Sequence, residues 1–185
     1  MTEHDRHPEI ETNRLSLIPL RKDDLETYAK IMGAREVGKW FPKGDGYTRE
    51  ESEKSLNAIL KHWDKHDFGI WGVVDKANGA LIGRCGLNMI DETSEVEVDF
   101  VLAPNSWGRG YATEAAKAAL AYGFQKLKLE NIIALAKPEN TASRRVIEKI
   151  GMQFKRNAEY WGITCAYYAI SKAYYEEISR LKERF

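Results

Sequence analysis

The segment from residue 95 to residue 115 constrains the fold most, because it joins an alternating strand to a glycine loop and then to a helix. Successive side chains of a strand point to opposite faces. The strand over 95–102 therefore sends Val96, Val98, Phe100 and Leu102 to one face, and Glu95, Glu97, Asp99 and Val101 to the other. This alternation is typical of a half-buried strand, so the segment predicts a sheet with a helix following it.

The connection after that strand is the most informative part of the segment. Small residues at 108, 110 and 112 let the main chain approach a ligand, and the start of a helix leaves N–H groups without internal partners. Such groups suit a phosphate or pyrophosphate, and Arg109 adds a cation. The alternative is a tight connection that binds nothing. The loop lacks the Lys-Ser/Thr of a P-loop and the third glycine of a dinucleotide fingerprint, which argues against a nucleotide hydrolase.

The other elements follow from periodicity and capping patterns. Strands are expected over 10–20, 68–74, 80–89, 132–136, 152–160 and 163–170, and helices over 25–32, 112–126, 140–150 and 172–184, with a loop over 37–47. Thr48 and Glu51 form a capping-box pattern that begins a further helix. We predict a flexible tail over residues 1–9 and one α/β (α+β) domain over residues 10–185, with a mostly antiparallel sheet.

Charge and composition argue against several classes of protein. The 28 Lys and Arg residues balance 28 Asp and Glu residues, so neither nucleic acid nor an anionic membrane is an expected partner. No stretch approaches the ~20 apolar residues that span a bilayer, and the polar first residues lack the core of a signal peptide. Cys85 and Cys165 lie in apolar runs, as reduced, buried thiols do, and a disulfide between them is the alternative. These features predict a cytoplasmic protein.

Three segments together resemble one family. They are Thr12-Asn13-Arg14-Leu15-Ser16-Leu17, Trp107 to Ala115, and Asn140 to Met152. In this order and spacing they resemble the GNAT-superfamily N-acetyltransferases of the ribosomal-protein alanine acetyltransferase-like branch, over nearly the whole chain. The resemblance implies the GNAT fold, a twisted, mixed and mostly antiparallel sheet of about seven strands flanked by helices. It also implies an acetyl-coenzyme A cleft where the strands 95–102 and 132–136 splay apart.

The resemblance further implies which residues hold acetyl-coenzyme A as the co-substrate, without a metal ion. The pantetheine arm would lie along the main chain of 100–102, the pyrophosphate on the N–H groups of 108–113, and Asn140 beside the pantetheine. The implied contacts are Phe100, Val101, Leu102, Trp107, Gly108, Arg109, Gly110, Tyr111, Ala112, Thr113, Asn140 and Ser143. Ile147 stands where many relatives carry a tyrosine general acid, so that role must lie elsewhere.

The implied reaction is transfer of acetyl to a primary amine by direct attack in a ternary complex. Glu97 is the expected base, directly or through water, because a carboxyl between two valines would have a raised pKa. The alternative is that Glu95, Glu97 and Asp99 form the solvated face of a half-exposed strand. Ser143 is expected to donate a hydrogen bond to the departing thiolate. Its alternative is a polar residue of the first helical turn.

The acceptor stays open between a protein N-terminal α-amine and a small-molecule amine. Trp40 and Phe41, and one of Tyr160, Trp161 or Tyr167, are candidates for lining its pocket. Acids cluster between 91 and 99 and bases between 137 and 156, which predicts a cleft with a negative acceptor side and a positive donor side. A different class of function also fits, a coenzyme A-binding sensor without turnover. The chain could be a monomer or a homodimer.

The pair His62 and His66 has the i, i+4 spacing that can place two imidazoles on one helix face. The pair lacks the glutamate and third ligand of a metalloprotease motif. A solvated helix face is therefore the better interpretation than a metal site.

Overall fold

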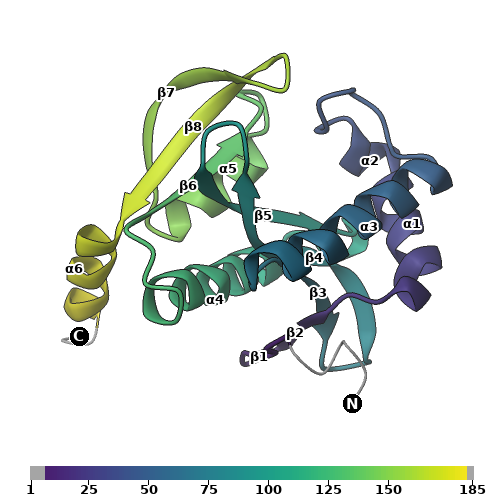
Figure 1. The fold of residues 1–185 in the computed structure, drawn as a ribbon, viewed down its shortest axis with the longest axis horizontal. Helices are drawn as coiled ribbons and strands as arrows, with labels where there is room; N and C mark the ends of the chain where they lie inside the picture. The colour runs from purple at the N-terminus through teal and green to yellow at the C-terminus, as the bar shows by residue number, and fades with distance from the viewer. Residues whose placement is uncertain (1–6, 183–185) are drawn as a thin grey trace.

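An eight-stranded sheet forms the centre of the computed structural model, which describes residues 7–182 (Figure 1). Its strands are β1 (Ile10–Glu11), β2 (Leu15–Pro19), β3 (Ile70–Asp75), β4 (Ala80–Ile90), β5 (Glu95–Leu102), β6 (Asn131–Ala136), β7 (Gln153–Tyr160) and β8 (Ile163–Ser171). They lie in the order β1-β2-β3-β4-β5-β6-β8-β7, and only β5 and β6 run parallel. The mixed, mostly antiparallel sheet is as expected.

The predicted first strand over 10–20 is in fact two antiparallel strands, which brings the count from about seven to eight. The chain turns back between them because Thr12 bonds to Leu15. The Thr12 N–H donates to the Leu15 carbonyl at 2.9 Å, and the Leu15 N–H donates to the Thr12 hydroxyl oxygen at 3.0 Å. Periodicity alone misses this bend, since the residues on both sides of it are extended.

Six helices flank the sheet among the described residues: α1 (Leu25–Gly33), α2 (Arg35–Gly38), α3 (Arg49–His66), α4 (Tyr111–Gln125), α5 (Thr141–Lys149) and α6 (Lys172–Lys182). Short 3-10 turns over Lys22–Asp24 and Pro104–Ser106 precede α1 and α4. The predicted capping box of α3 is confirmed, with Thr48 and Glu51 bonded to each other in both directions. The expected loop over 37–47 is wrong at its start, where Val37 and Gly38 complete α2.

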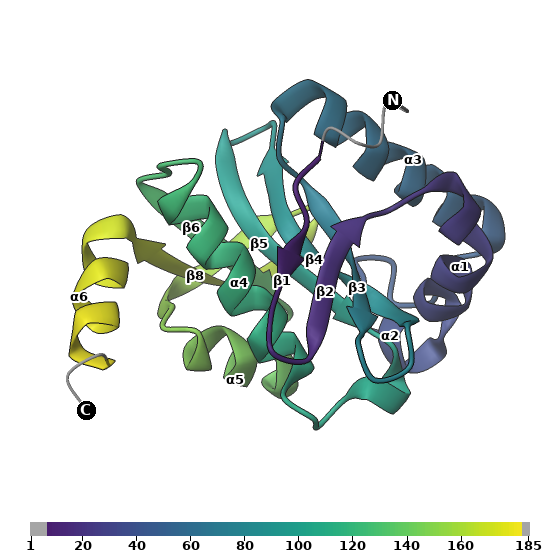
Figure 2. The ribbon, with the colours of Figure 1, turned by 90° about the horizontal axis from the view of Figure 1, so that it is seen from below.

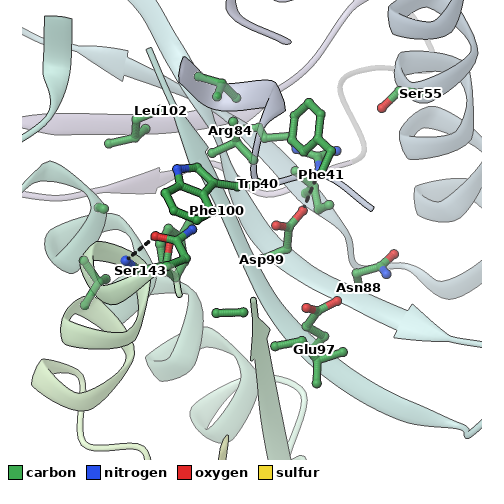
Figure 3. Close-up of a pocket in the computed structure, with 18 of the residues that line it drawn as sticks. Trp40, Phe41, Ser55, Arg84, Asn88, Glu97, Asp99, Phe100, Leu102 and Ser143 are labelled. Atoms are coloured by element: carbon green, nitrogen blue, oxygen red, sulfur yellow. Dashed lines mark hydrogen bonds and ion pairs between the residues drawn. The ribbon is translucent and has the colours of Figure 1, made fainter. Parts of the chain in front are cut away.

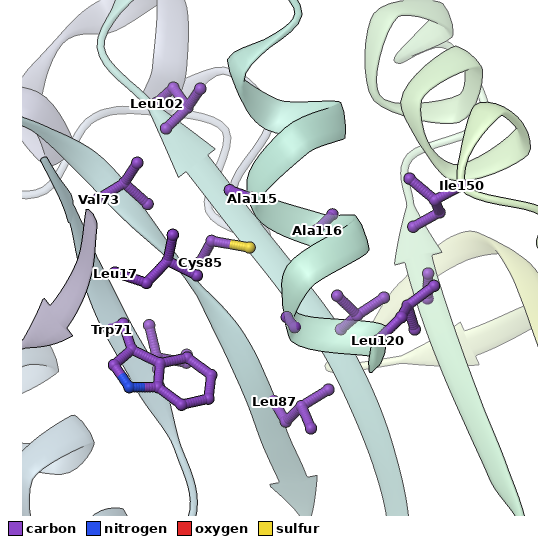
Figure 4. Close-up of a cluster of buried hydrophobic side chains, with 14 of the residues drawn as sticks. Leu17, Trp71, Val73, Cys85, Leu87, Leu102, Ala115, Ala116, Leu120 and Ile150 are labelled. Carbon is purple, nitrogen blue, oxygen red and sulfur yellow. The ribbon is translucent and has the colours of Figure 1, made fainter. Parts of the chain in front are cut away.

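One face of the sheet packs against α4. The stripe of α4 that includes Ala115, Ala116 and Leu120 is buried against Cys85 and Leu87 of β4 (Figure 4). Cross-strand partners share a face, and β4 pairs with β5 so that Leu87 lies opposite Val98. The apolar face predicted for β5 is therefore the α4 face. Figure 2 shows α4 lying across the strands, with α5 beside it.

The other face of the sheet carries the acidic residues of β5. Helices α1 and α3 lie over the β4 side of this face, with Tyr28 of α1 bonded to Arg84 of β4. On the β6 side, where β8 continues the sheet, a small apolar cluster of Ile90, Ile133 and Tyr167 is buried. No helix within residues 7–182 combines the length and apolarity needed to cross a membrane.

The strands β5 and β6 separate beyond a single point of contact. They pair only at Glu97 and Ile133, whereas β4 pairs with β5 at eight positions and β6 with β8 at six. From Glu97 towards Leu102, β5 thus has a strand partner on its β4 side alone.

The expected N-terminal tail is described only in part. Residues 1–6 lie outside the described part of the chain, and the Pro8 carbonyl accepts a hydrogen bond from the Trp71 indole at 2.7 Å.

Candidate functional site

A cavity of about 1010 Å³ opens where β5 and β6 part. Its wall contains both candidate catalytic residues, Glu97 and Ser143, and every other expected contact except Arg109. These other residues are Phe100, Val101, Leu102, Trp107, Gly108, Gly110, Tyr111, Ala112, Thr113 and Asn140. The structure thus brings together, around one cavity, the edge of β5 that faces the opening, the acidic face of β5, and the N-terminal ends of α4 and α5.

The glycine loop, residues 108–113, lies at one end of the cavity. Gly108 and Gly110 have φ of 74° and 78°, a left-handed conformation that favours glycine. Gly110 is the N-cap of α4 and offers no side chain, so no side chain caps that helix. The first N–H groups of α4 therefore remain available to an anion. The Trp107 indole donates to the Leu102 carbonyl at 2.8 Å, which ties the loop to the end of β5.

Arg109 differs from the other residues of the loop because its side chain does not line the cavity. Its guanidinium lies 4.7 Å from the centre of the Tyr111 ring and 3.9 Å from the Asp75 carboxylate. The Tyr111 hydroxyl also donates to Asp75, at 3.0 Å. The expected cation is thus directed towards the β3–β4 turn, and the loop presents main-chain N–H groups to the cavity.

Glu97 is a buried carboxyl at the branch point of the sheet, 7% exposed. Burial raises its pKa well above the ordinary value, and the neighbouring Asp99 raises it further, while Arg84 and the main chain of Leu135 act in the opposite direction. Figure 3 shows Glu97 and Asp99 side by side on the same face of β5. A carboxyl in this environment can take up a proton near neutral pH, as a general base requires.

Asp99 forms part of a polar chain that the sequence did not indicate. Arg84 of β4 donates to Asp99 at 2.9 Å and to the Tyr28 hydroxyl at 3.2 Å. Tyr28 in turn shares a hydrogen bond of 2.8 Å with Ser55 of α3. A lone arginine inside the apolar run of β4 was the available signal, since a buried charge needs a partner. The identity of that partner depends on the register of β4 with β5.

The start of α5 supplies Asn140 and Ser143. Asn140 caps the helix, because its side-chain oxygen accepts from the Ser143 N–H at 3.1 Å. That bond uses the main chain of Ser143, and both side chains line the cavity. Figure 3 shows Ser143 on the far side of the sheet opening from Asp99.

The alternative of a solvated acidic face on β5 is wrong. Glu95 accepts hydrogen bonds from the hydroxyls of Tyr160 and Tyr167, each at 2.6 Å. Burial, followed by the bond to Glu95, raises the pKa of Tyr167 to about 12. Partial burial acts to raise the pKa of Glu95, but the bonds from the two tyrosines outweigh it and the pKa is lowered. Since Asp99 is paired with Arg84, Glu97 is the carboxyl of this strand that faces the cavity without an ion-pair partner among residues 7–182.

The predicted division of charge between the two sides of the cleft is only partly present. On the acceptor side, Asp91 pairs with Lys65 and Asp99 with Arg84, each at 2.9 Å, so two of the five acids between 91 and 99 are compensated by an ion pair. On the donor side Lys137, Arg145 and Lys149 line the cavity. Lys137 also donates to the Lys39 carbonyl at 3.1 Å, which joins the two sides across the opening.

His62 is held by the main chain at both ring nitrogens. Its Nε2 accepts from the Met89 N–H at 2.9 Å, so its Nδ1 carries the proton and donates to the Phe68 carbonyl at 2.9 Å. Burial lowers the pKa of His62, and the neighbouring His66 lowers it further. Within residues 7–182 no cluster of three or more His, Cys, Asp or Glu side chains is placed to hold a metal ion.

Comparison with known proteins assigns the family. The family model described as "Acetyltransferase (GNAT) domain" matches residues 14–153. The chain belongs to the GNAT acetyltransferases. The N-acetyltransferase class and the GNAT family expected from the sequence are therefore confirmed, and GNAT acetyltransferases take their acetyl group from acetyl-coenzyme A.

Individual GNAT proteins agree with this assignment. The uncharacterized N-acetyltransferase p20 of Bacillus licheniformis is 31% identical over 146 residues, which make up 77% of this chain and 80% of the relative. A GNAT-family acetyltransferase from Bacillus anthracis is 29% identical and has a TM-score of 0.77, with 90% of this chain and 99% of that chain covered. The structure of AAC(6')-Ib with ribostamycin and coenzyme A is 16% identical, with a TM-score of 0.76 over 89% and 97% of the two chains, and shares the fold.

Proposed function

We propose that residues 10–185 form one domain that transfers acetyl from acetyl-coenzyme A to a primary amine by direct attack in a ternary complex. One observation carries the proposal: a single cavity runs from the glycine loop, through the opening between β5 and β6, to the buried carboxyl of Glu97. A thioester donor needs an anion cradle, an extended main chain for its amides and a dry end for its acyl group. The cavity offers these three in that order.

The donor would occupy the side formed by α4, α5 and the free edge of β5. The pyrophosphate would accept from the N–H groups of residues 108–113, near the cations of Arg145 and Lys149. The pantetheine amides would pair with β5 between Phe100 and Leu102, where β6 has moved away. The side chain of Asn140 would bond the same arm from the start of α5.

The chemical step would take place at the branch point of the sheet. The amine enters as an ammonium ion and gives a proton to Glu97, directly or through water, and its nitrogen then attacks the thioester carbon. The carbonyl oxygen is stabilised by an N–H of β5. The carbon–sulfur bond breaks, an amide forms, and the thiolate leaves with a hydrogen bond from the Ser143 hydroxyl. The second amine proton goes to the thiolate, so coenzyme A is released as a thiol.

The two cysteines support direct attack, because neither is suited to carry the acetyl group. Burial raises the pKa of Cys165 to about 11, and raises that of Cys85 further. The thiolate is the nucleophilic form of cysteine. Both side chains are therefore inert thiols near neutral pH.

The acceptor would enter between two groups of aromatic side chains. Trp40, Phe41 and Tyr47 line one side of the cavity, and Trp161 at the tip of the β7–β8 hairpin lines the other. Such walls suit the apolar part of an amine, of a small molecule or of a protein N-terminus. The ribostamycin complex named above supports a small-molecule amine as the first class to test.

A turnover assay separates this enzyme from a coenzyme A sensor. The chain is incubated with acetyl-coenzyme A and each member of a panel of polyamines, amino sugars and N-terminal peptides, and both released thiol and product mass are measured. We expect thiol release that depends on one class of amine. The product should be about 42 Da heavier than that amine, because an acetyl group replaces a hydrogen atom. Tight binding of coenzyme A with no amine-dependent thiol release would establish the sensor instead.

A further inference from the structure

Two of the segments that carry the family resemblance meet at the carboxylate of Glu114, in the first turn of α4. One oxygen of Glu114 accepts from the Thr12 hydroxyl at 2.7 Å and from the Arg14 main-chain N–H at 2.8 Å. The other oxygen accepts from the Arg14 side chain, at 2.7 Å from both Nε and Nη2. The bend between β1 and β2 is thus fastened to a helix 100 residues further along the chain.

Arg14 extends this contact to the glycine loop itself. Its Nη1 donates to the Arg109 carbonyl at 2.8 Å. Its guanidinium lies 4.6 Å from the centre of the Tyr111 ring, which Arg109 contacts as well. Asp75 holds the hydroxyl of the same ring. The loop is therefore held at the carbonyl of one residue and at the ring of another, from outside the cavity.

The capping of the helices explains why such an external contact is needed. Side chains cap α3 and α5, those of Thr48 and Asn140. No side chain caps α4, whose N-cap Gly110 sits in a left-handed conformation. A local cap would occupy an N–H group that an anion must reach. A loop with free N–H groups and two flexible glycines therefore needs contacts from another part of the chain to hold its conformation.

We propose that Thr12, Arg14 and Glu114 form a positioning clamp that holds the glycine loop in its anion-binding conformation. These three residues do not line the cavity, so they act through the loop rather than on the ligand. The consequence for coenzyme A rests on the function proposed above. The effect on the loop itself does not.

A competing role for Arg14 is a direct contact with a phosphate, since its side chain is 42% exposed. The two roles predict opposite effects of Glu114→Gln. If Arg14 bound phosphate, removing the carboxylate would release a cation and tighten coenzyme A binding. In the clamp, the same change loosens the loop and weakens binding. The three bonded nitrogens of Arg14 favour the clamp.

Calorimetric titration with coenzyme A tests the two roles. We expect Kd to rise about tenfold in Glu114→Gln and in Arg14→Lys, because lysine keeps the charge but cannot bridge the carboxylate and the loop. With acetyl-coenzyme A, KM should rise while kcat stays within about twofold. Turnover of S-acetylpantetheine, which has no pyrophosphate, should not change. The matched control is Glu26→Gln, which breaks an exposed ion pair with Arg49 on α1 and α3. Tighter or unchanged binding by Glu114→Gln, or normal binding by Arg14→Lys, overturns the clamp.

A second measurement needs no coenzyme. Trypsin cleaves after Arg109 only if the loop leaves its conformation, so the rate of cleavage between Arg109 and Gly110 reports loop opening. We expect this rate to rise several-fold in Arg14→Lys and Glu114→Gln, at a temperature where all variants are folded, and not in Glu26→Gln. Equal rates would refute the clamp. If the unmodified chain fails to bind coenzyme A, the proposed function fails, and the trypsin rates still decide the clamp.

Discussion

Replacing Glu97 by glutamine tests the proposed chemistry most directly, because the two side chains have the same shape and only one can accept a proton. Glu97 is buried and lies where the sheet branches. A positioned general base contributes about 10²- to 10⁴-fold to a rate, which corresponds to about 2.7–5.4 kcal/mol of transition-state stabilisation. We expect Glu97→Gln to lower kcat by a factor within that range, about 10²- to 10⁴-fold, with little change in the Kd of coenzyme A.

The pH dependence gives a sharper criterion than the rate. The unmodified enzyme should gain activity as pH rises through the pKa of Glu97, which burial and Asp99 raise above its ordinary value. Thiol release is measured at saturating substrates from about pH 5.5 to about pH 9.5, and the acidic limb should disappear in Glu97→Gln. The control is Glu92→Gln, which removes an exposed acid from the turn between β4 and β5. A Glu97→Gln enzyme with normal kcat and the same acidic limb would show that the base is another group.

Stability should change in the opposite direction from activity. The pKa of Glu97 is higher in the folded chain than in the unfolded chain, so its favourable contribution is present below the unfolded pKa and is lost as pH rises through the folded pKa. At a pH above the acidic limb of the activity profile, Glu97 is ionised in the folded chain, so Glu97→Gln removes a buried charge and we expect a higher Tm than that of the unmodified chain. A gain of ~1 kcal/mol corresponds to about 2–4 °C for a chain of this length. At about pH 4, near the pKa of an unfolded glutamate, the difference in Tm between the variant and the unmodified chain should shrink. A variant that is less stable at both pH values would show that Glu97 is not a buried, ionised carboxylate at the higher pH.

Other parts of the structure give three further predictions. Ser143→Ala should lower kcat about tenfold without a change in Tm, because the cap on Asn140 uses the Ser143 main chain; an unchanged kcat would remove Ser143 from the chemical step. Thr48→Ala should cost about 1 kcal/mol in urea unfolding, and a cost near zero would mean that the capping box contributes nothing. Burial lowers the pKa of His62 in the folded chain, so the protein should lose stability as pH falls below about 6.5, the pKa of an unfolded histidine. His62→Gln should therefore flatten the dependence of the unfolding free energy on pH between about pH 7.5 and about pH 5. Parallel profiles for the two proteins would refute this role.

Local patterns predicted the elements that bury one face. The alternation of 95–102 gives the two faces of β5 correctly, and the alanine-rich stripe of 112–126 is the buried side of α4. Both predictions succeed because the side chains that define them lie within one element and follow its period. The capping box at Thr48 succeeds for the same reason, since its two partners are three residues apart.

The predictions that failed or were missing depend on partners far apart in sequence. The alternative of a solvated acidic strand is wrong because the hydroxyls of Tyr160 and Tyr167 donate to Glu95. These tyrosines lie 65 and 72 positions after Glu95 in the sequence. Arg84 finds Tyr28 at a separation of 56. The direction of the Arg109 side chain depends on Tyr111 and on the β3–β4 turn. No periodicity or local motif contains this information, which arises only when the register of the sheet is set.

Three departures from ordinary packing lie around one cavity, and their position there is an argument for function. Among residues 7–182, the one buried side-chain polar atom without a partner is Nε of Arg84. Glu97 is a buried carboxyl, and Trp161 has a φ of 51°, a strained value for a bulky residue. All three residues line the cavity, beside the free edge of β5. Each feature costs stability in the free chain, and unpaired strand groups of β5 are satisfied only by water or by a ligand. The position of these three costs along one opening supports the proposal that the opening receives an extended, amide-bearing donor.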